Sequence, residues 1–223
     1  MCGRFTLFEA DKVLSKEFGV SGVPLLSPRY NIAPSQAVAA VRASPAGAGR
    51  ELAHLRWGLI PSWSKDPAIG NRLINARAET VREKPSFRNA FRRHRCLIPA
   101  SGFYEWLRQE RGKQPYYVRM RDARIFAFAG LWDRWESPEK GLIESCTILT
   151  TAANAVLVPI HDRMPVILPA GEYARWLDPT LQDADSLAPL LASFPPEEME
   201  AFPVSPRVNA PTTDDEKCVA PLP

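Results

Sequence analysis

Strand-like runs of apolar and β-branched residues account for most of the elements that the sequence pattern predicts. Residues 37–43 and 52–57 form two such runs around a turn rich in Gly, Ala and Pro, which predicts a hairpin. Four more strand-like segments follow and carry the β-branched and aromatic residues that fit a pleated surface: 96–106, 115–120, 124–135 and 143–153. Short strands linked by Gly or Pro turns predict a curled sheet or a barrel-like core.

Helical periodicity is confined to short segments. Residues 9–18 predict an amphipathic helix with its apolar positions on one side. Residues 78–93 alternate charged with apolar positions and predict short helices, and residues 171–177 and 185–193 predict further short helices on the outside. The chain contains 22 prolines, so we expect the elements to be short and joined by shaped loops.

Charge is distributed unevenly along the 223 residues. Residues 178–223 contain nine acidic and two basic residues, whereas residues 1–177 contain 26 basic and 16 acidic residues. Eight Lys or Arg residues and two Glu residues lie between 72 and 95. A basic body suits a polyanionic partner, and the alternative is an ordinary solvated surface. Residues 206–223 are polar, acidic and contain proline, and we interpret them as a C-terminal tail after a domain over residues 1–205.

Cysteine usage and the first residues bear on the cellular compartment. The four cysteines form no CxxC pair, so the sequence predicts neither a zinc site nor a disulfide framework, and no other metal or cofactor is predicted. Cys96 and Cys146 lie in apolar runs that predict core positions. Because the chain has neither a secretion signal pattern nor a run of about 18 apolar residues, we expect a cytoplasmic protein that does not span a membrane.

Cys2, directly after the initiator Met, offers the most specific chemistry in the chain. Cells usually remove Met1 when residue 2 is small, and Cys2 would then carry a free α-amine beside its thiol. The amine adds to an aldehyde to give a Schiff base, and the thiol then closes a five-membered thiazolidine. Unperturbed, the two groups titrate at about 8 and about 8.5. The alternative is a small buried residue on a first strand.

Three further residues are candidates to assist Cys2. Glu105 lies in an otherwise apolar strand, where a cleft would raise the pKa of its carboxyl and suit it to proton transfer. His161 lies in a loop and has the side chain that most readily moves protons near neutral pH. Asn75 and Arg77 are two residues apart and share one face of an extended segment. The alternatives are a surface strand position for Glu105, a satisfied loop residue for His161 and a turn former for Asn75.

A second group of residues indicates single-stranded nucleic acid. Arg4, Arg77 and Arg163 lie next to the candidate catalytic positions, and Trp63 ends a predicted loop. Aromatic faces stack on bases while arginines neutralise phosphates, a combination that favours single strands. Pro34 is placed to wedge against an unstacked base. The alternative for Trp63 is a core position.

Taken together, these segments resemble the SOS response-associated peptidase (SRAP) family. The matching motifs run in the family's order: MCGRF (1–5), RYNIAPSQ (29–36), WGLIPSW (57–63), NARAET (75–80), RCLIPASGFYEW (95–106), FAGLWD (128–133), TTAAN (150–154) and IHDRMPVIL (160–168). The resemblance implies an α+β fold, a single domain with a curled, barrel-like, mostly antiparallel β core flanked by short helices. The sequence departs from the family at the C-terminus, where APTTDDEK follows Val208-Asn209 in place of an Asn-Asp pair.

The same resemblance implies a sensor of abasic sites in single-stranded DNA. In the family, the mature N-terminal Cys forms a thiazolidine crosslink with the ring-opened sugar aldehyde and shields the lesion. The four active-site positions of the family fall on Cys2, Asn75, Glu105 and His161. Asn75 would orient the N-terminus and the sugar oxygen, Glu105 would be the acid/base, and His161 would assist ring opening and reversal. The implied DNA contacts are Arg4, Asn31, Pro34, Trp63, Arg77 and Arg163.

The family name also implies a peptidase. The clearest proteolytic event is removal of the residue before Cys2, by the protein itself or by another enzyme. We expect a nucleoid-associated monomer that meets the replication machinery. Two rival interpretations remain: an N-terminal-nucleophile hydrolase of the glutamine amidotransferase type, and a single-strand binding module without covalent chemistry.

Overall fold

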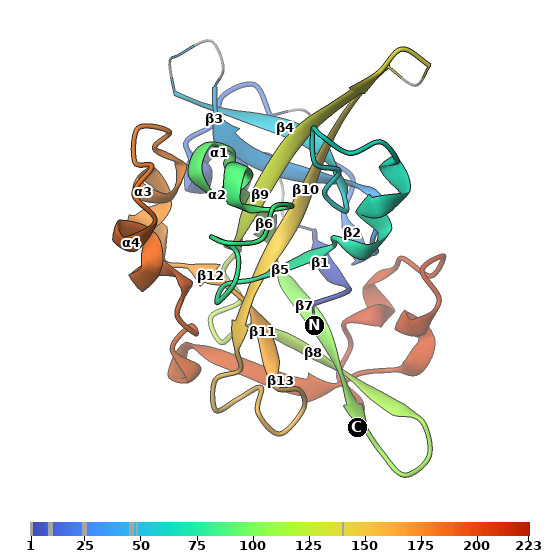
Figure 1. The fold of residues 1–223 in the computed structure, drawn as a ribbon. Helices are drawn as coiled ribbons and strands as arrows, with labels where there is room; N and C mark the ends of the chain where they lie inside the picture. The colour runs from blue at the N-terminus through green and yellow to red at the C-terminus, as the bar shows by residue number, and fades with distance from the viewer. Residues whose placement is uncertain (1, 9–10, 24–25, 45–46, 48, 140) are drawn as a thin grey trace.

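The computed structural model describes residues 2–8, 11–23, 26–44, 47, 49–139 and 141–223 (Figure 1). The strands are β1 (Phe5–Leu7), β2 (Arg29–Ile32), β3 (Ala37–Ala43), β4 (Arg50–Trp57), β5 (Asn75–Arg77), β6 (Arg95–Ala100), β7 (Gly102–Arg108), β8 (Lys113–Met120), β9 (Phe126–Ser137), β10 (Gly141–Ala152), β11 (Arg163–Pro165), β12 (Ile167–Leu168) and β13 (Met199–Pro203). The α-helices are α1 (Asp11–Phe18), α2 (Arg88–Arg93), α3 (Tyr173–Leu177) and α4 (Ala184–Leu187). The short 3-10 helices are η1 (Pro67–Arg72), η2 (Ala170–Glu172), η3 (Ala188–Leu191), η4 (Pro196–Glu198), η5 (Pro206–Asn209) and η6 (Glu216–Cys218).

Five strands close into a barrel. β3 pairs with β4 and β6, β6 pairs with β9, and β9 pairs with β10 over the long hairpin that crosses Figure 1. β10 then pairs with β4 and completes the ring. This last pairing is parallel, whereas the other four are antiparallel. The barrel-like, mostly antiparallel core that the sequence predicts is therefore confirmed.

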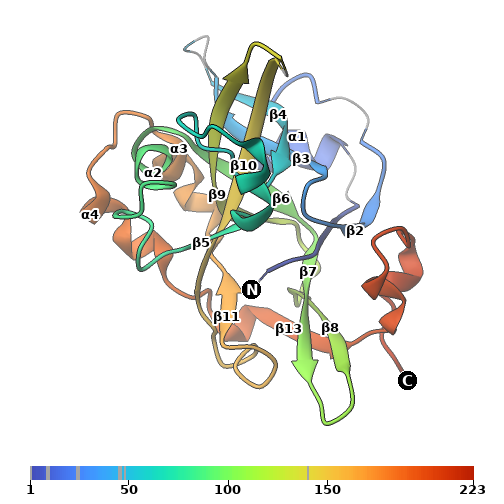
Figure 2. The same ribbon diagram turned by 45° about the vertical axis from the view of Figure 1, so that its right-hand side comes forward.

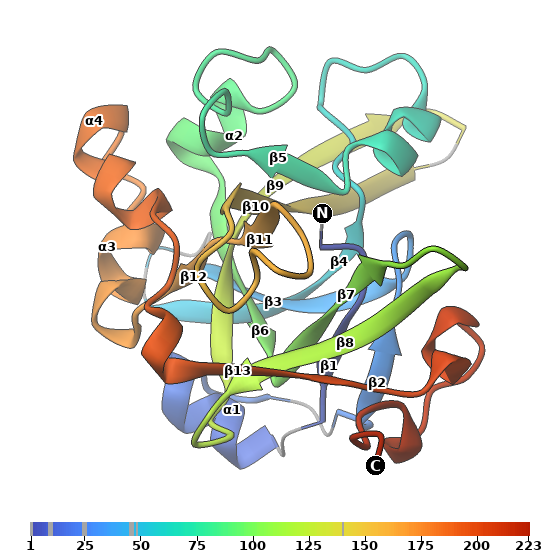
Figure 3. The ribbon, with the colours of Figure 1, turned by 90° about the horizontal axis from the view of Figure 1, so that it is seen from below.

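A second sheet lies against one end of the barrel. Its order is β13-β8-β7-β1-β2, and all of its pairings are antiparallel. Ser101 alone separates β6 of the barrel from β7 of this sheet. Figures 2 and 3 show the N-terminal end of the chain close to β5, β7 and β11, where the two sheets meet. The fold thus brings the first residues between elements that are far apart in the sequence.

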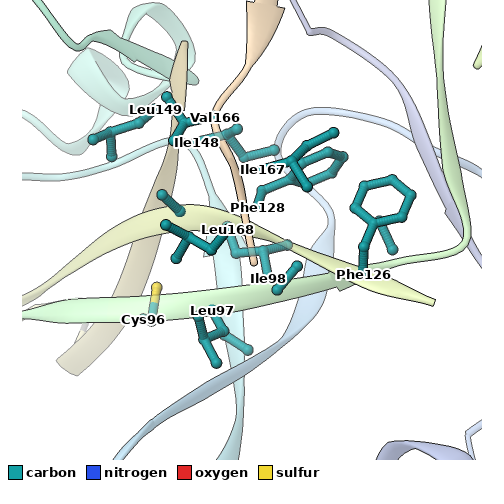
Figure 4. Packing of buried hydrophobic residues seen from close by; sticks show 14 of the residues in the cluster. Cys96, Leu97, Ile98, Phe126, Phe128, Ile148, Leu149, Val166, Ile167 and Leu168 are labelled. Carbon is teal, nitrogen blue, oxygen red and sulfur yellow. The ribbon is translucent and has the colours of Figure 1, made fainter. Parts of the chain in front are cut away.

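Aliphatic and aromatic side chains fill the space between the strands (Figure 4). Ile98, Phe128, Ile148 and Val166 have no exposed surface. Cys96 and Cys146 are also fully buried, as their apolar surroundings predict. Close packing of side chains of this kind supplies the main driving force for folding.

The helices lie on the outside of the barrel, as the pattern predicts (Figure 1). The amphipathic helix expected over 9–18 is observed as α1, and residues 9–10 lie outside the described residues. The segment 171–177 contains α3, and the segment 185–193 contains most of α4 and all of η3. Among the described residues, no helix combines the length and the apolar composition needed to cross a membrane.

The C-terminal segment, residues 206–223, packs against β2. The fully buried amide of Asn31 donates to the carbonyl oxygens of Val208, Ala210 and Thr213 at 3.2, 3.0 and 2.6 Å. The Asp214 carboxylate accepts from the backbone N–H of Asn31 at 2.9 Å and from the Arg29 guanidinium. The segment interpreted as a tail from its composition is therefore held by buried polar groups, and Val208 is itself fully buried.

Candidate active site

Cys2 lies in the interior, in the segment that leads into β1. Its side chain has no exposed surface. The Asn75 side-chain amide, on β5, donates a 2.7 Å hydrogen bond to the Cys2 carbonyl oxygen. The parallel pairing of β5 with β10 fixes Asn75 beside Ile148. A long-range hydrogen bond therefore holds the residue whose α-amine Met1 removal would release.

Glu105 approaches Cys2 from β7. The neighbouring residues Tyr104 and Arg4 are joined by a 3.0 Å hydrogen bond from the Tyr104 N–H to the Arg4 carbonyl, which aligns β7 with the segment after Cys2. Burial raises the pKa of the Cys2 thiol far above its usual range, and the Glu105 charge raises it further. Burial also raises the pKa of Glu105, against the opposing effects of His161 and the Trp106 N–H. Glu105 is only 2% exposed, so it faces the interior beside Cys2.

His161 lies on the loop between β10 and β11. Asn154, at the start of this loop, is buried; its side-chain oxygen accepts from the N–H groups of Val156 and Leu157 at 3.2 Å. His161 Nδ1 accepts a 2.9 Å hydrogen bond from the Arg163 N–H and lies 3.0 Å from Asp162 Oδ1. The TTAAN motif thus shapes the loop that presents His161.

Arg4 and Asn31 are joined to each other and to the C-terminal segment. The Arg4 guanidinium donates to Asn31 Oδ1 and to the Val208 carbonyl, both at 2.7 Å. It also lies 6.0 Å from the centre of the Trp106 ring, within the range of a cation–π contact. Both residues therefore have structural partners in the free protein, and their DNA contacts stay predictions.

Pro34 and Trp63 lie on turns. The Gln36 N–H donates to the Ala33 carbonyl across Pro34 and Ser35, and Ser35 has a φ of 68°. Pro at the second position and a positive φ at the third are typical of a type II turn. Trp63 follows the strand β4 and is 59% exposed. The core alternative for Trp63 is therefore wrong, and its stacking on DNA stays a prediction.

Arg77 and Arg163 differ in their surroundings. Arg77 lies on β5 and is exposed, with buried Ala76 between it and Asn75, as expected for an extended segment. The Arg163 guanidinium donates to both oxygens of Glu79 at 2.6 and 3.0 Å and to the Thr150 carbonyl at 2.6 Å. A phosphate would therefore compete with Glu79 for Arg163.

Comparison with known families gives one match over most of the chain. The family model described as SOS response associated peptidase (SRAP) matches residues 1–211. The chain belongs to this family.

Two relatives named for abasic site processing differ in how much of their length the chain covers. Abasic site processing protein YoqW of Bacillus subtilis is 43% identical in an alignment of 223 positions, which covers 98% of this chain and 99% of the relative. Abasic site processing protein HMCES of Xenopus tropicalis is 35% identical over 77% of this chain and 57% of the relative. A crystal structure of a protein from Bacteroides thetaiotaomicron has a TM-score of 0.88 and 29% identity, covering 99% of this chain and 100% of that one.

The sequence analysis did not single out two residues that shape the candidate site, Glu79 and Asn154. Glu79 is part of the NARAET motif but gave no signal of its own, because its partner Arg163 is 84 positions away. Asn154 lies in the TTAAN motif and likewise acts through contacts that no local pattern reveals. Within the described part of the chain, no three His, Cys, Asp or Glu residues gather closely enough to hold a metal ion.

Proposed function

We propose that this protein recognises abasic sites in single-stranded DNA and bonds to them covalently through the α-amine and thiol of Cys2. One observation carries the proposal: Cys2 is held by Asn75 at 2.7 Å in a buried site whose thiol is within the electrostatic reach of Glu105. The names of the relatives, which describe abasic site processing, support the same substrate.

The proposed reaction has two steps. The α-amine of Cys2 attacks the C1 aldehyde of the ring-opened abasic sugar, and loss of one water leaves an imine. The Cys2 thiol then adds to the imine carbon, a C–S bond forms, and the thiol proton ends on the former imine nitrogen. The product is a thiazolidine whose mass equals protein plus DNA minus one water. Because both nucleophiles sit on one residue, ring closure is intramolecular and strongly favoured.

Glu105 is the proposed proton carrier. A thiol with a raised pKa is protonated at neutral pH, so it needs a base to become nucleophilic. The carboxylate of Glu105 takes the proton as the thiol attacks and returns it to nitrogen, whereas its protonated form assists loss of water. The charge of His161 opposes the rise in the pKa of Glu105. In this proposal His161 assists opening of the sugar ring and reversal of the crosslink.

Release of the α-amine precedes this chemistry. While Met1 remains, the nitrogen of Cys2 is part of a peptide bond and cannot form an imine. The peptidase activity in the family's name corresponds in this proposal to cleavage of the Met1–Cys2 bond, by the protein itself or by a processing enzyme.

The proposal is tested with Met1-processed protein and a single-stranded oligonucleotide that carries one abasic site. We expect a heat-stable shifted band on a denaturing gel, with the mass of protein plus DNA minus one water. The matched controls are the same oligonucleotide without the lesion and protein that retains Met1, and neither should give the band. If processed protein gives no adduct, the covalent function is wrong; glutamine hydrolysis would then favour the amidotransferase interpretation, and lesion-independent binding the non-covalent module.

Replacing Glu105 with glutamine is expected to slow crosslinking by about 100-fold at neutral pH, because general acid–base catalysis typically contributes at least this much. The wild-type rate should rise with pH through the raised pKa of Glu105, since the carboxylate is the active base, and again as the α-amine loses its proton. The variant should lose the first rise and keep the second. Rates at saturating DNA from pH 4 to 9 measure this; a first rise that survives in Glu105→Gln would assign it to another group.

A further inference from the structure

The exposed Trp63 is carried by a turn that is anchored on both sides. The turn itself is closed by a 2.8 Å hydrogen bond from the Ser64 N–H to the Pro61 carbonyl. On one side of Trp63, the Ser62 N–H donates to Asp133 Oδ2 at 2.9 Å. On the other side, the Ser64 carbonyl accepts from the Trp135 indole N–H at 2.7 Å. Both anchors come from β9, so one strand of the barrel holds the turn.

The surroundings of Asp133 favour the charged form of its carboxylate. It is only 5% exposed, and its Oδ1 accepts a second hydrogen bond from the Arg134 N–H at 2.8 Å. Burial opposes its ionisation, but His94 and the N–H groups of Ser62 and Arg134 outweigh burial and hold its pKa below the ordinary value. Hydrogen bonds to a charged acceptor are about twice as strong as neutral ones. The hydrogen bond from the Ser62 N–H to the Asp133 carboxylate is therefore a strong one.

Trp63 itself lies between two hollows that suit a polyanion. One hollow, of about 540 Å³, is lined by Trp63 together with two basic residues, Lys65 and Arg72, and one acidic residue, Asp66. The other, of about 480 Å³, is lined by Trp63 together with Pro85 and Arg88. Among the ion pairs of the described residues, none includes Lys65, Arg72 or Arg88. An aromatic face between such cations is the arrangement that binds single-stranded nucleic acid.

We propose that Asp133 and Trp135 are positioning residues for DNA binding, which hold the 61–64 turn so that Trp63 is presented to the bases beside the lesion. The inference rests on the proposed function and assigns a task to Asp133, the last residue of the FAGLWD motif. An unanchored turn would have to be ordered at the moment of binding, and that ordering weakens affinity. The two residues touch the turn and not the reacting atoms, so their effect falls on affinity and leaves the chemical step alone.

The test is a double-mutant cycle measured with intact single-stranded DNA by fluorescence anisotropy. Asp133→Asn keeps the side-chain shape but replaces the carboxylate, and Trp135→Phe keeps a buried ring but removes the indole N–H. We expect each to raise Kd on the order of five- to tenfold, and Trp63→Ala to raise it on the order of tenfold or more. In a Trp63→Ala background, Asp133→Asn should change Kd by less than about twofold, because coupled residues are not additive. In Asp133→Asn and in Trp135→Phe, the crosslinking rate at saturating abasic DNA should stay within about twofold of wild type.

Trp176→Phe is the matched control for a lost buried indole hydrogen bond. Trp176 is fully buried on α3 and donates to the Cys96 carbonyl at 2.9 Å, away from the turn. It should lower the melting temperature as Trp135→Phe does and leave Kd unchanged. Three results would each overturn the inference. The first is an equal loss of affinity with and without Trp63, and the second is an unchanged Kd in folded Asp133→Asn. The third is a wild-type protein that does not bind single strands. If wild type binds but forms no adduct, the covalent function fails while the affinity cycle still decides this inference.

Discussion

Alanine in place of Cys2 is expected to reduce formation of the heat-stable DNA adduct by about 1,000-fold or more, the scale on which loss of a covalent nucleophile acts. The variant keeps an α-amine after Met1 removal but has no thiol to close the ring. Its imine with the abasic aldehyde hydrolyses, so no stable product accumulates. Because only one sulfur atom leaves a fully buried position, the free energy of unfolding should fall by only about 1 kcal/mol. Denaturing gels with mass spectrometry measure the first effect and urea unfolding the second.

Serine at the same position separates the two functional groups of Cys2. Cys2→Ser should form an imine that borohydride traps, and should nick the strand at the abasic site, without giving a stable thiazolidine. A heat-stable adduct of the mass of protein plus DNA minus one water in Cys2→Ala would contradict the mechanism, because the attachment would then come from another residue.

Replacing Arg95 with alanine is expected to lower the free energy of unfolding by about 3–5 kcal/mol, because several backbone carbonyl groups lose a charged donor at once. Arg95 is 4% exposed, and its guanidinium donates to the carbonyl groups of Phe91, Arg92, Trp176, Asp178 and Leu181. These contacts join the ends of α2 and α3 to the barrel strand β6. Alanine would leave several buried carbonyl groups without donors. Urea unfolding followed by circular dichroism measures the loss.

Arg93→Ala is the control for the loss of one positive charge. Arg93 is exposed on α2, so its replacement should change the free energy of unfolding by no more than about 0.5 kcal/mol. A loss of less than about 1 kcal/mol for Arg95→Ala would show that water or a rearranged side chain replaces its donors. The role assigned to Arg95 in joining α2 and α3 to β6 would then be wrong.

The sequence predicts the long strands of this fold better than its closure. β3, β9 and β10 carry enough apolar and β-branched residues to be recognised in isolation. β5, β11 and β12 contain two or three residues each, too few for any periodicity. The parallel contact of β10 with β4 joins segments about ninety positions apart, as Ser145 opposite Arg56 shows. Such a pairing depends on the whole fold and leaves no local pattern.

Candidate site residues could be selected by their chemistry, and in part by resemblance, but their surroundings could not. Asn31 is a predicted DNA contact through the family resemblance, and Arg95 is one of the cations counted in the basic stretch between 72 and 95. In the structure Asn31 is fully buried against the C-terminal segment, and Arg95 holds two helix ends. Counting charges along a sequence assumes that each is solvated, and a buried arginine breaks that assumption.

The hydrogen bond from Arg4 to the Val208 carbonyl joins two residues that are 204 positions apart in the chain. At about 5–20 residues per second, roughly ten to forty seconds separate the synthesis of the two partners. During that interval Arg4 lacks the Val208 carbonyl as an acceptor, and the Asn31 amide lacks the carbonyl oxygens of Val208, Ala210 and Thr213. The segment that leads into β1 therefore gains its last long-range contacts only after residues 208–213 have been made.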